Sequence, residues 1–93
     1  MRIIIVGCGK VGSTITEQLV KEGHDVAVID RDSGVIQDIT NNFDVMGVVG
    51  NGASYSIQKE AGIEDAHLLI AVTGSDEQNL LCCLFAKKAG NCN

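Results

Sequence analysis

The sequence predicts an α/β fold, a doubly wound parallel sheet with helices on both faces. Short apolar runs alternate with amphipathic stretches along the 93 residues, the pattern of parallel strands connected by helices. The first run leads into a glycine-rich loop of the G-x-G-x-x-G type, between Gly7 and Gly12. The second run ends on Asp30, 18 residues after the last glycine of the loop. An acid at roughly 20 residues is expected in a Rossmann-type βαβ unit.

The first half of the chain contains three expected strands, over residues 2–6, 25–30 and 44–49. A helix is expected over residues 11–22, with its apolar face formed by Val11, Ile15 and Leu19. A second helix is expected to begin at an Asp32/Ser33 cap and to bury Val35, Ile36 and Ile39. Glycines at the ends of amphipathic stretches predict left-handed helix caps at Gly23 and Gly62.

The second half adds a short helix over residues 54–61, a strand over 67–72 and a helix over 75–89. Right-handed crossovers place the four strands in the order 3-2-1-4. A full doubly wound domain has two more strands, so residues 1–93 are expected to form one Rossmann-type domain that lacks the last strands. The strand over 67–72 would then be an edge, which favours an excised piece over a sheet completed by another chain.

Composition excludes several classes of function. A net charge of −5 and an aromatic content of 3% disfavour nucleic-acid binding. No apolar stretch approaches the roughly 20 residues of a membrane span, and the chain begins in strand pattern, so neither membrane insertion nor a signal peptide is expected. The cysteines lack C-x-x-C spacing, which disfavours a metal site and a redox pair and favours buried thiols in a reducing cytosol. They are Cys8, Cys82, Cys83 and Cys92.

The candidate site lies outside the carboxyl ends of the strands, where the strand order reverses between the first and fourth strands. The glycine loop and the start of the next helix present backbone amides to a phosphate there. Lys10 adds a positive charge, although it can equally be a solvated surface lysine. The expected phosphate-binding residues are Gly7, Cys8, Gly9, Lys10, Val11 and Gly12.

The loops after the other strands complete the expected site. Asp30 can accept hydrogen bonds from ribose hydroxyls and would repel a 2′-phosphate, which favours NAD over NADP. Arg31 can stack on adenine or instead accommodate a 2′-phosphate. After the third strand, the loop can reach the base or can simply be a tight turn before a cap at Ser54. The residues expected near base and ribose in these later loops are Asn51, Gly52, Ala53, Thr73 and Gly74.

No catalytic residue is expected in this chain. His24 precedes the second expected strand and His67 opens the fourth, so both lie at the amino ends of strands, opposite the crevice. No serine, cysteine or carboxylate has an adjacent general base in the sequence pattern. The chain therefore predicts a binding domain rather than an enzyme, with the cofactor-binding fragment of an NAD-dependent oxidoreductase as the alternative. A fragment that binds nothing is a third reading.

Several short segments together carry a family resemblance: residues 3–12, 22–26, 29–32, 60–66, 69–73 and 75–80. Through them the chain resembles the regulator-of-K⁺-conductance (RCK or KTN, TrkA-N type) nucleotide-binding domain, in particular that of Trk potassium-uptake regulatory subunits of the TrkA type. Two features depart from the family pattern: Lys10 stands where arginine is frequent, and Asn51 where aspartate is common. The segment over 69–80 is more specific than the glycine loop, because ordinary dehydrogenases do not share it.

The resemblance implies a non-catalytic regulatory domain that binds a nucleotide, with NAD(H) favoured and ATP or ADP as the alternative. Its implied partner is a membrane K⁺ transporter or channel subunit, whose ion flow the bound nucleotide would gate. It also implies a homo-oligomer, either a dimer or a ring. The location implied is cytoplasmic, peripheral to the inner face of the membrane through that partner.

Overall fold

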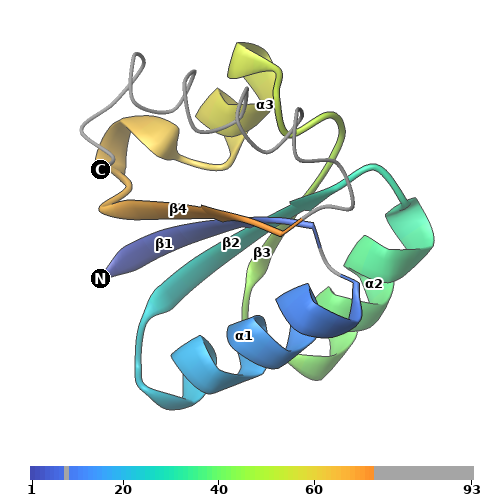
Figure 1. Cartoon of the computed structure of the whole chain (residues 1–93), viewed down its shortest axis with the longest axis vertical. Helices are drawn as coiled ribbons and strands as arrows, with labels where there is room; N and C mark the ends of the chain where they lie inside the picture. Colours follow the sequence, from blue (N-terminus) through green and yellow to red (C-terminus); the bar gives the residue numbers. More distant parts are fainter. Residues whose placement is uncertain (8, 73–93) are drawn as a thin grey trace.

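Four parallel strands form the central sheet, which the computed structural model arranges in the order β3-β2-β1-β4 (Figure 1). The structure describes residues 1–7 and 9–72. The predicted fold class and strand order are confirmed. The strands are β1 (Arg2–Val6), β2 (Asp25–Asp30), β3 (Met46–Val49) and β4 (Leu68–Ala71). The helices are α1 (Lys10–Lys21), α2 (Ser33–Asn42), α3 (Tyr55–Glu60) and the 3₁₀ turn η1 (Ile63–Asp65).

Helices cover both faces of the sheet, with α1 and α2 on one face and α3 and η1 on the other (Figure 1). Because strand side chains alternate, β1 contributes to both cores, and its four consecutive apolar residues are all buried. Burying each such side chain stabilises the fold by about 1.5–3 kcal/mol. The buried core toward α1 and α2 contains Ile3, Ile5, Val26, Val28, Ile36 and Ile39. The core toward α3 and η1 includes Ile4, Val6, Ala27, Ile29, Val48 and Ile63.

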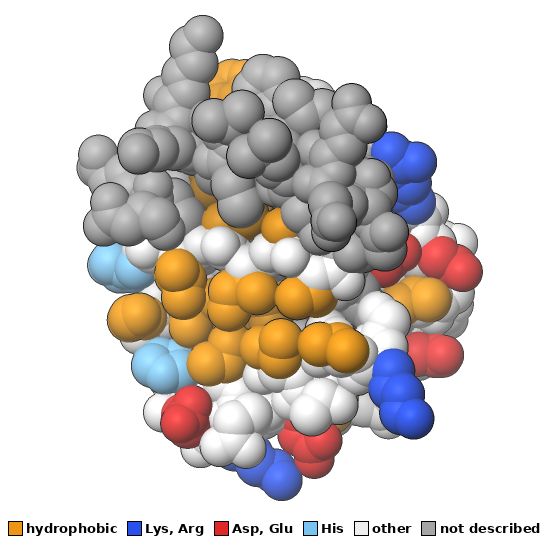
Figure 2. All heavy atoms as spheres, viewed as in Figure 1, with side chains coloured by type: hydrophobic (Ala, Val, Ile, Leu, Met, Phe, Trp, Pro, Cys, Tyr) orange, Lys and Arg blue, Asp and Glu red, His pale blue; other side chains and the backbone are white. Residues whose placement is uncertain are grey.

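Strand β4 lies at one side of the described sheet, where it pairs with β1. Its residues Leu68 and Ile70, followed by Val72, are half-buried and pack toward the α1 layer. Figure 2 shows hydrophobic side chains gathered in the middle of this face of the molecule, over the region of β4 and α1. The sheet therefore presents an apolar strip along β4.

Helix α1 is rotated relative to the predicted orientation. The sequence placed Val11, Ile15 and Leu19 on the buried face, but Val11 is 62% exposed. Gly12 and Thr16 face the sheet instead, and Ile15 and Leu19 are half-buried beside them. The reason is steric, because α1 can approach β1 only along its glycine side, which turns Val11 outward.

Both predicted glycine caps are present. Gly23 has φ +85° and closes α1 with two bonds, from its own amide to the Val20 carbonyl (3.0 Å) and from the His24 amide to the Leu19 carbonyl (3.1 Å). This pair of bonds is a Schellman motif. Gly62 has φ +90° and follows α3 in the same left-handed conformation.

The two predicted amino-terminal caps differ. The Asp32 carboxylate caps α2 by accepting hydrogen bonds from the amides of Gly34 (2.9 Å) and Val35 (3.4 Å). Ser54 occupies the cap position of α3 but makes no side-chain cap bond, and its hydroxyl lies 3.0 Å from that of Ser56. Only the first of these caps therefore works through its side chain.

The remaining differences from the sequence prediction concern element ends, the burial of one side chain and one short turn. Strand β3 begins at Met46 rather than at residue 44, and Val35 is half-buried rather than buried. The 3₁₀ turn η1 was not predicted, because three residues are too few to show a periodicity. The helix expected over residues 75–89 lies outside the described residues.

Candidate functional site

The predicted site residues that the structure describes lie at or just after the carboxyl ends of β1, β2 and β3, at one edge of the sheet. In a doubly wound sheet the ligand crevice opens at this edge, where the strand order reverses between β1 and β4. Cys8, in the glycine loop, lies outside the described residues, and so do Thr73 and Gly74 after β4. Their predicted contributions remain untested.

The glycine loop has the geometry expected of a phosphate-binding turn. Gly7 leaves β1 with φ +100°, a left-handed conformation that favours glycine, and its amide donates to the Ile29 carbonyl at 2.8 Å. A side chain at Gly12 would collide with the Gly7 carbonyl oxygen. Apart from the chain neighbours of Gly9, no described residue would lie within 4 Å of a Cβ there. The described part of the loop is therefore packed tightly on its strand side, and no described residue covers it outside Gly9.

Helix α1 begins at Lys10, directly after Gly9. The first amides of an α-helix have no intrahelical carbonyl to bind, and the helix dipole favours an anion there by about 0.3–1 kcal/mol. The first turn of α1 contains no acidic residue that would oppose an anion, and Lys10 is exposed beside it. Exposed Val11 leaves the helix end accessible from outside.

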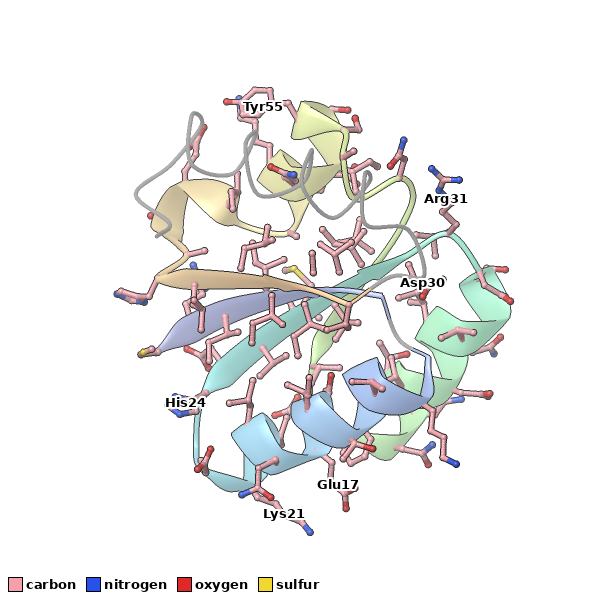
Figure 3. All side chains as sticks on the ribbon, in the orientation of Figure 1. Glu17, Lys21, His24, Asp30, Arg31 and Tyr55 are labelled. Atoms are coloured by element: carbon pink, nitrogen blue, oxygen red, sulfur yellow. The ribbon has the colours of Figure 1, made fainter. Side chains whose placement is uncertain are left out.

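Asp30 ends β2 next to the glycine loop and is half-buried (Figure 3). Its Oδ1 accepts a hydrogen bond from the Asp32 amide at 2.9 Å, which orients the carboxylate. The α2 cap is made by Asp32, so Asp30 is not the helix cap. Arg31 is exposed and projects away from the sheet (Figure 3).

The loop after β3 is a braced turn. The Asn51 side-chain oxygen accepts from the Ala53 amide at 2.9 Å, and the Ser54 amide donates to the Asn51 carbonyl at 2.9 Å. Gly52 is buried against Val6, the last residue of β1. The tight turn considered from the sequence is therefore present, and it lies beside the glycine loop.

One residue of this region was missed by the sequence analysis. Gln58, in α3, is fully buried, and its Nε2 donates to the Gly52 carbonyl at 2.7 Å. A polar residue in an amphipathic helix normally indicates the solvent face, so the pattern gave no sign of this contact. A glutamine one turn into the helix that follows a glycine turn would be the signal to look for.

The histidines lie at the opposite edge, as predicted. His24 Nδ1 is 3.1 Å from the amino-terminal nitrogen of Met1, and His67 Nδ1 accepts from the Arg2 amide at 3.1 Å. Both contacts tie the amino ends of neighbouring strands to β1. Across the stretches 1–7 and 9–72, no three metal-binding side chains (His, Cys, Asp or Glu) come together in a group that could hold an ion.

Within the part of the chain that the structure describes, no helix has the length and apolar character of a membrane span. The parallel sheet, the glycine turn at its switch point and the acid at the end of β2 define a Rossmann-type domain. The chain belongs to the TrkA-N domain family, whose family model matches residues 3–93. The predicted family is thereby confirmed.

Curated relatives of the chain are Trk system potassium uptake proteins. The TrkA protein of Halomonas elongata is 41% identical over 86 residues, which cover 92% of this chain and 19% of that protein. A TrkA homolog of Methanothermobacter thermautotrophicus is 34% identical over 88 residues, covering 95% of this chain and 41% of that protein. The chain thus spans between about a fifth and two fifths of the length of these relatives.

Solved structures share the fold. The TrkA-N domain of the Escherichia coli inner membrane protein ybaL has a TM-score of 0.89 and 24% identity, over 97% of this chain and 66% of that chain. The Kef C-terminal domain of Shewanella denitrificans, in its AMP-bound form, has a TM-score of 0.82 and 23% identity, over 95% and 52%. The GsuK channel bound to NAD has a TM-score of 0.83 and 19% identity, over 98% and 16%. At these identities the likeness establishes the fold alone.

Proposed function

We propose that this chain is the nucleotide-binding regulatory domain of a K⁺ uptake transporter or channel, and that nucleotide occupancy of the crevice gates K⁺ transport. The observation that carries the nucleotide half is the turn at Gly7 and Gly12. The close contact between these two glycines lets α1 lie directly against the end of β1, so the amino end of the helix faces the switch point of the sheet. Asp30, at the end of the neighbouring strand, supplies the polar group that a ribose requires.

The favoured ligand is NAD(H). The Asp30 carboxylate, oriented by the Asp32 amide, suits two ribose hydroxyls and opposes a 2′-phosphate. ATP and ADP are the alternative, because the same phosphate and ribose contacts serve any adenine nucleotide. The fold relatives solved with NAD and with AMP support an adenine nucleotide as the ligand class.

Each predicted residue has a proposed role in this binding mode. The glycine loop holds the phosphates, the end of β2 holds the ribose, and the loops after β3 and β4 hold the base and the second ribose or phosphate. The phosphate group of residues is Gly7, Cys8, Gly9, Lys10, Val11 and Gly12. The remaining residues are Asp30, Arg31, Asn51, Gly52, Ala53, Thr73 and Gly74.

The potassium half of the proposal is supported by the relatives, which are named as potassium uptake proteins. In this role the domain performs no chemistry and changes conformation when the nucleotide binds. It would act on the inner face of the membrane, as a dimer or ring attached to its K⁺-conducting partner. The competing function is a cofactor-binding fragment of an oxidoreductase.

Titration calorimetry of the chain with NAD⁺, NADH, ADP and ATP in parallel tests the proposal. A sensor must discriminate between related forms, so we expect a clear preference within one of the two pairs, NADH over NAD⁺ or ATP over ADP. Equal affinity for NAD⁺ and NADH together with no adenosine phosphate binding would favour the oxidoreductase fragment. Absence of binding to all four would contradict the nucleotide site.

A further inference from the structure

Gln58 is a fully buried polar side chain in α3 that the binding site described above does not use. A buried amide is costly unless it is hydrogen-bonded. Its Nε2 donates a hydrogen bond to the Gly52 carbonyl at 2.7 Å, which is a short bond between a core side chain and a loop. A residue of this kind is well placed to fix the loop rather than to contact a ligand.

The loop it holds is attached at two further points to the elements of the crevice. The Gly50 amide donates to the Asp30 carbonyl at 2.9 Å, which fastens the start of the loop to the end of β2. Gly52 rests on the Val6 side chain so closely that a Cβ there would collide with it. Val6 directly precedes Gly7, so the turn contacts the end of β1, next to the glycine loop, as well as the end of β2, which carries Asp30.

The outer side of the same turn is braced by the Asn51 side chain, which is exposed and accepts from the Ala53 amide at 2.9 Å. The turn therefore has a surface brace from Asn51 and a core brace from Gln58. The surface brace alone would fix the local turn but not its distance from β1. The Gln58–Gly52 bond supplies that second constraint, because α3 itself packs on the core of the sheet through Ile57, and Ala61 and Ile63 directly after the helix are buried in the same core.

We propose that Gln58 is a positioning residue for the nucleotide: it holds the turn at Gly52 against β1, so that the adenosine side of the ligand meets a preformed wall. The inference rests on the proposed function, which it deepens. Because Gln58 is completely buried, it acts through Gly52 and not by touching the ligand. Ordering the turn in advance removes an entropic cost that binding would otherwise carry.

The test compares Gln58→Met with the control Gln37→Met, the same change at an exposed glutamine of α2. Methionine has nearly the same length but no donor. We expect Gln58→Met to weaken ADP binding about two- to tenfold, the equivalent of one neutral hydrogen bond. Amide hydrogen exchange at Ala53 and Ser54 is expected to accelerate in the ligand-free chain. Gln37→Met is expected to change neither quantity.

Pyrophosphate separates positioning from general damage, because it can contact only the glycine loop. We expect its affinity to be the same in the wild type and in Gln58→Met, whereas loss of both ligands would overturn the positioning role. If methionine prevents folding, Gln58→Asn keeps the amide but shortens its reach, and the same selective loss of ADP is expected. Unchanged ADP affinity in a folded variant would overturn the inference alone. Absence of binding of NAD⁺, NADH, ADP and ATP alike by the wild type would overturn the proposed function together with it.

Discussion

The two ends of the sheet are built from the same strands but make opposite use of their backbone groups. At the amino ends, the Asp25 amide donates to the Met1 carbonyl at 2.9 Å, and the His67 amide donates to the Arg2 carbonyl at 2.8 Å. The His24 and His67 side chains bind the same short segment, and the Arg2 guanidinium lies 3.6 Å from the Asp65 carboxylate. These contacts close the amino ends of β2 and β4 onto β1, and we call this the closed edge. A pocket lined by Arg2, Asp25, Asp44 and Gly62 lies beside them.

At the carboxyl ends, glycines keep the backbone accessible. Gly9, the start of α1 and the half-buried Asp30 all lie at this edge, and apart from its chain neighbours no described residue would lie within 4 Å of a Cβ at Gly9 (Figure 3). Backbone hydrogen bonds tie the turns there to the neighbouring strand β2: the Gly7 amide donates to the Ile29 carbonyl, and the Gly50 amide donates to the Asp30 carbonyl. The comparison teaches that internal backbone bonds hold both edges, but histidine side chains add contacts at the amino ends, whereas glycines form the turns at the carboxyl ends.

Gly12→Ala is expected to have the largest effect. The new Cβ would collide with the Gly7 carbonyl oxygen and lie 3.3 Å from Val72 Cγ2, so α1 must move away from β1. We expect a loss of about 3 kcal/mol in the free energy of unfolding, the upper part of the overpacking range, measured by urea denaturation. Gly9→Ala is the matched control, since its Cβ meets nothing described within 4 Å. A Gly12→Ala domain as stable as the Gly9→Ala domain would contradict the close approach of helix and strand.

Asp30→Ala is expected to have the next largest effect, on binding rather than on stability. Loss of charge-assisted bonds to ribose should weaken nucleotide binding by about 1.5–3 kcal/mol, measured by titration calorimetry. The control is Asp38→Ala, which removes an exposed carboxylate from α2. Equal affinities of the two variants would remove Asp30 from the ribose site.

His67→Ala is expected to have the smallest effect. It removes the bond to the Arg2 amide at the closed edge, and because the residue is exposed, we expect a loss of about 0.5 kcal/mol in unfolding free energy. Nucleotide affinity should be unchanged, since this edge is opposite the crevice. His24→Ala provides a second variant at the same edge. Weaker nucleotide binding in either variant would break the functional separation of the two ends.

The sequence was sufficient for the strand order and for the gathering of site residues at one edge. Apolar runs mark the strands, and connection rules fix their order, without any knowledge of side-chain contacts. The rotation of α1 was not predictable from apolar periodicity, because the backbone approach at Gly12 outweighs the burial of Val11. The buried Gln58 was missed for a similar reason: its partner is a carbonyl six residues earlier, which helical periodicity does not indicate.

Backbone NMR chemical-shift mapping of the chain during titration with NADH tests most directly whether the open edge is the nucleotide site. We expect the largest amide shifts at residues 7 and 9–12, at Asp30 and Arg31, and over residues 50–54. Little change is expected at the closed edge, around His24 and His67. Saturable shifts concentrated at the closed edge, or none at any concentration of NADH or ADP, would contradict the assignment of the nucleotide to the carboxyl ends of the strands.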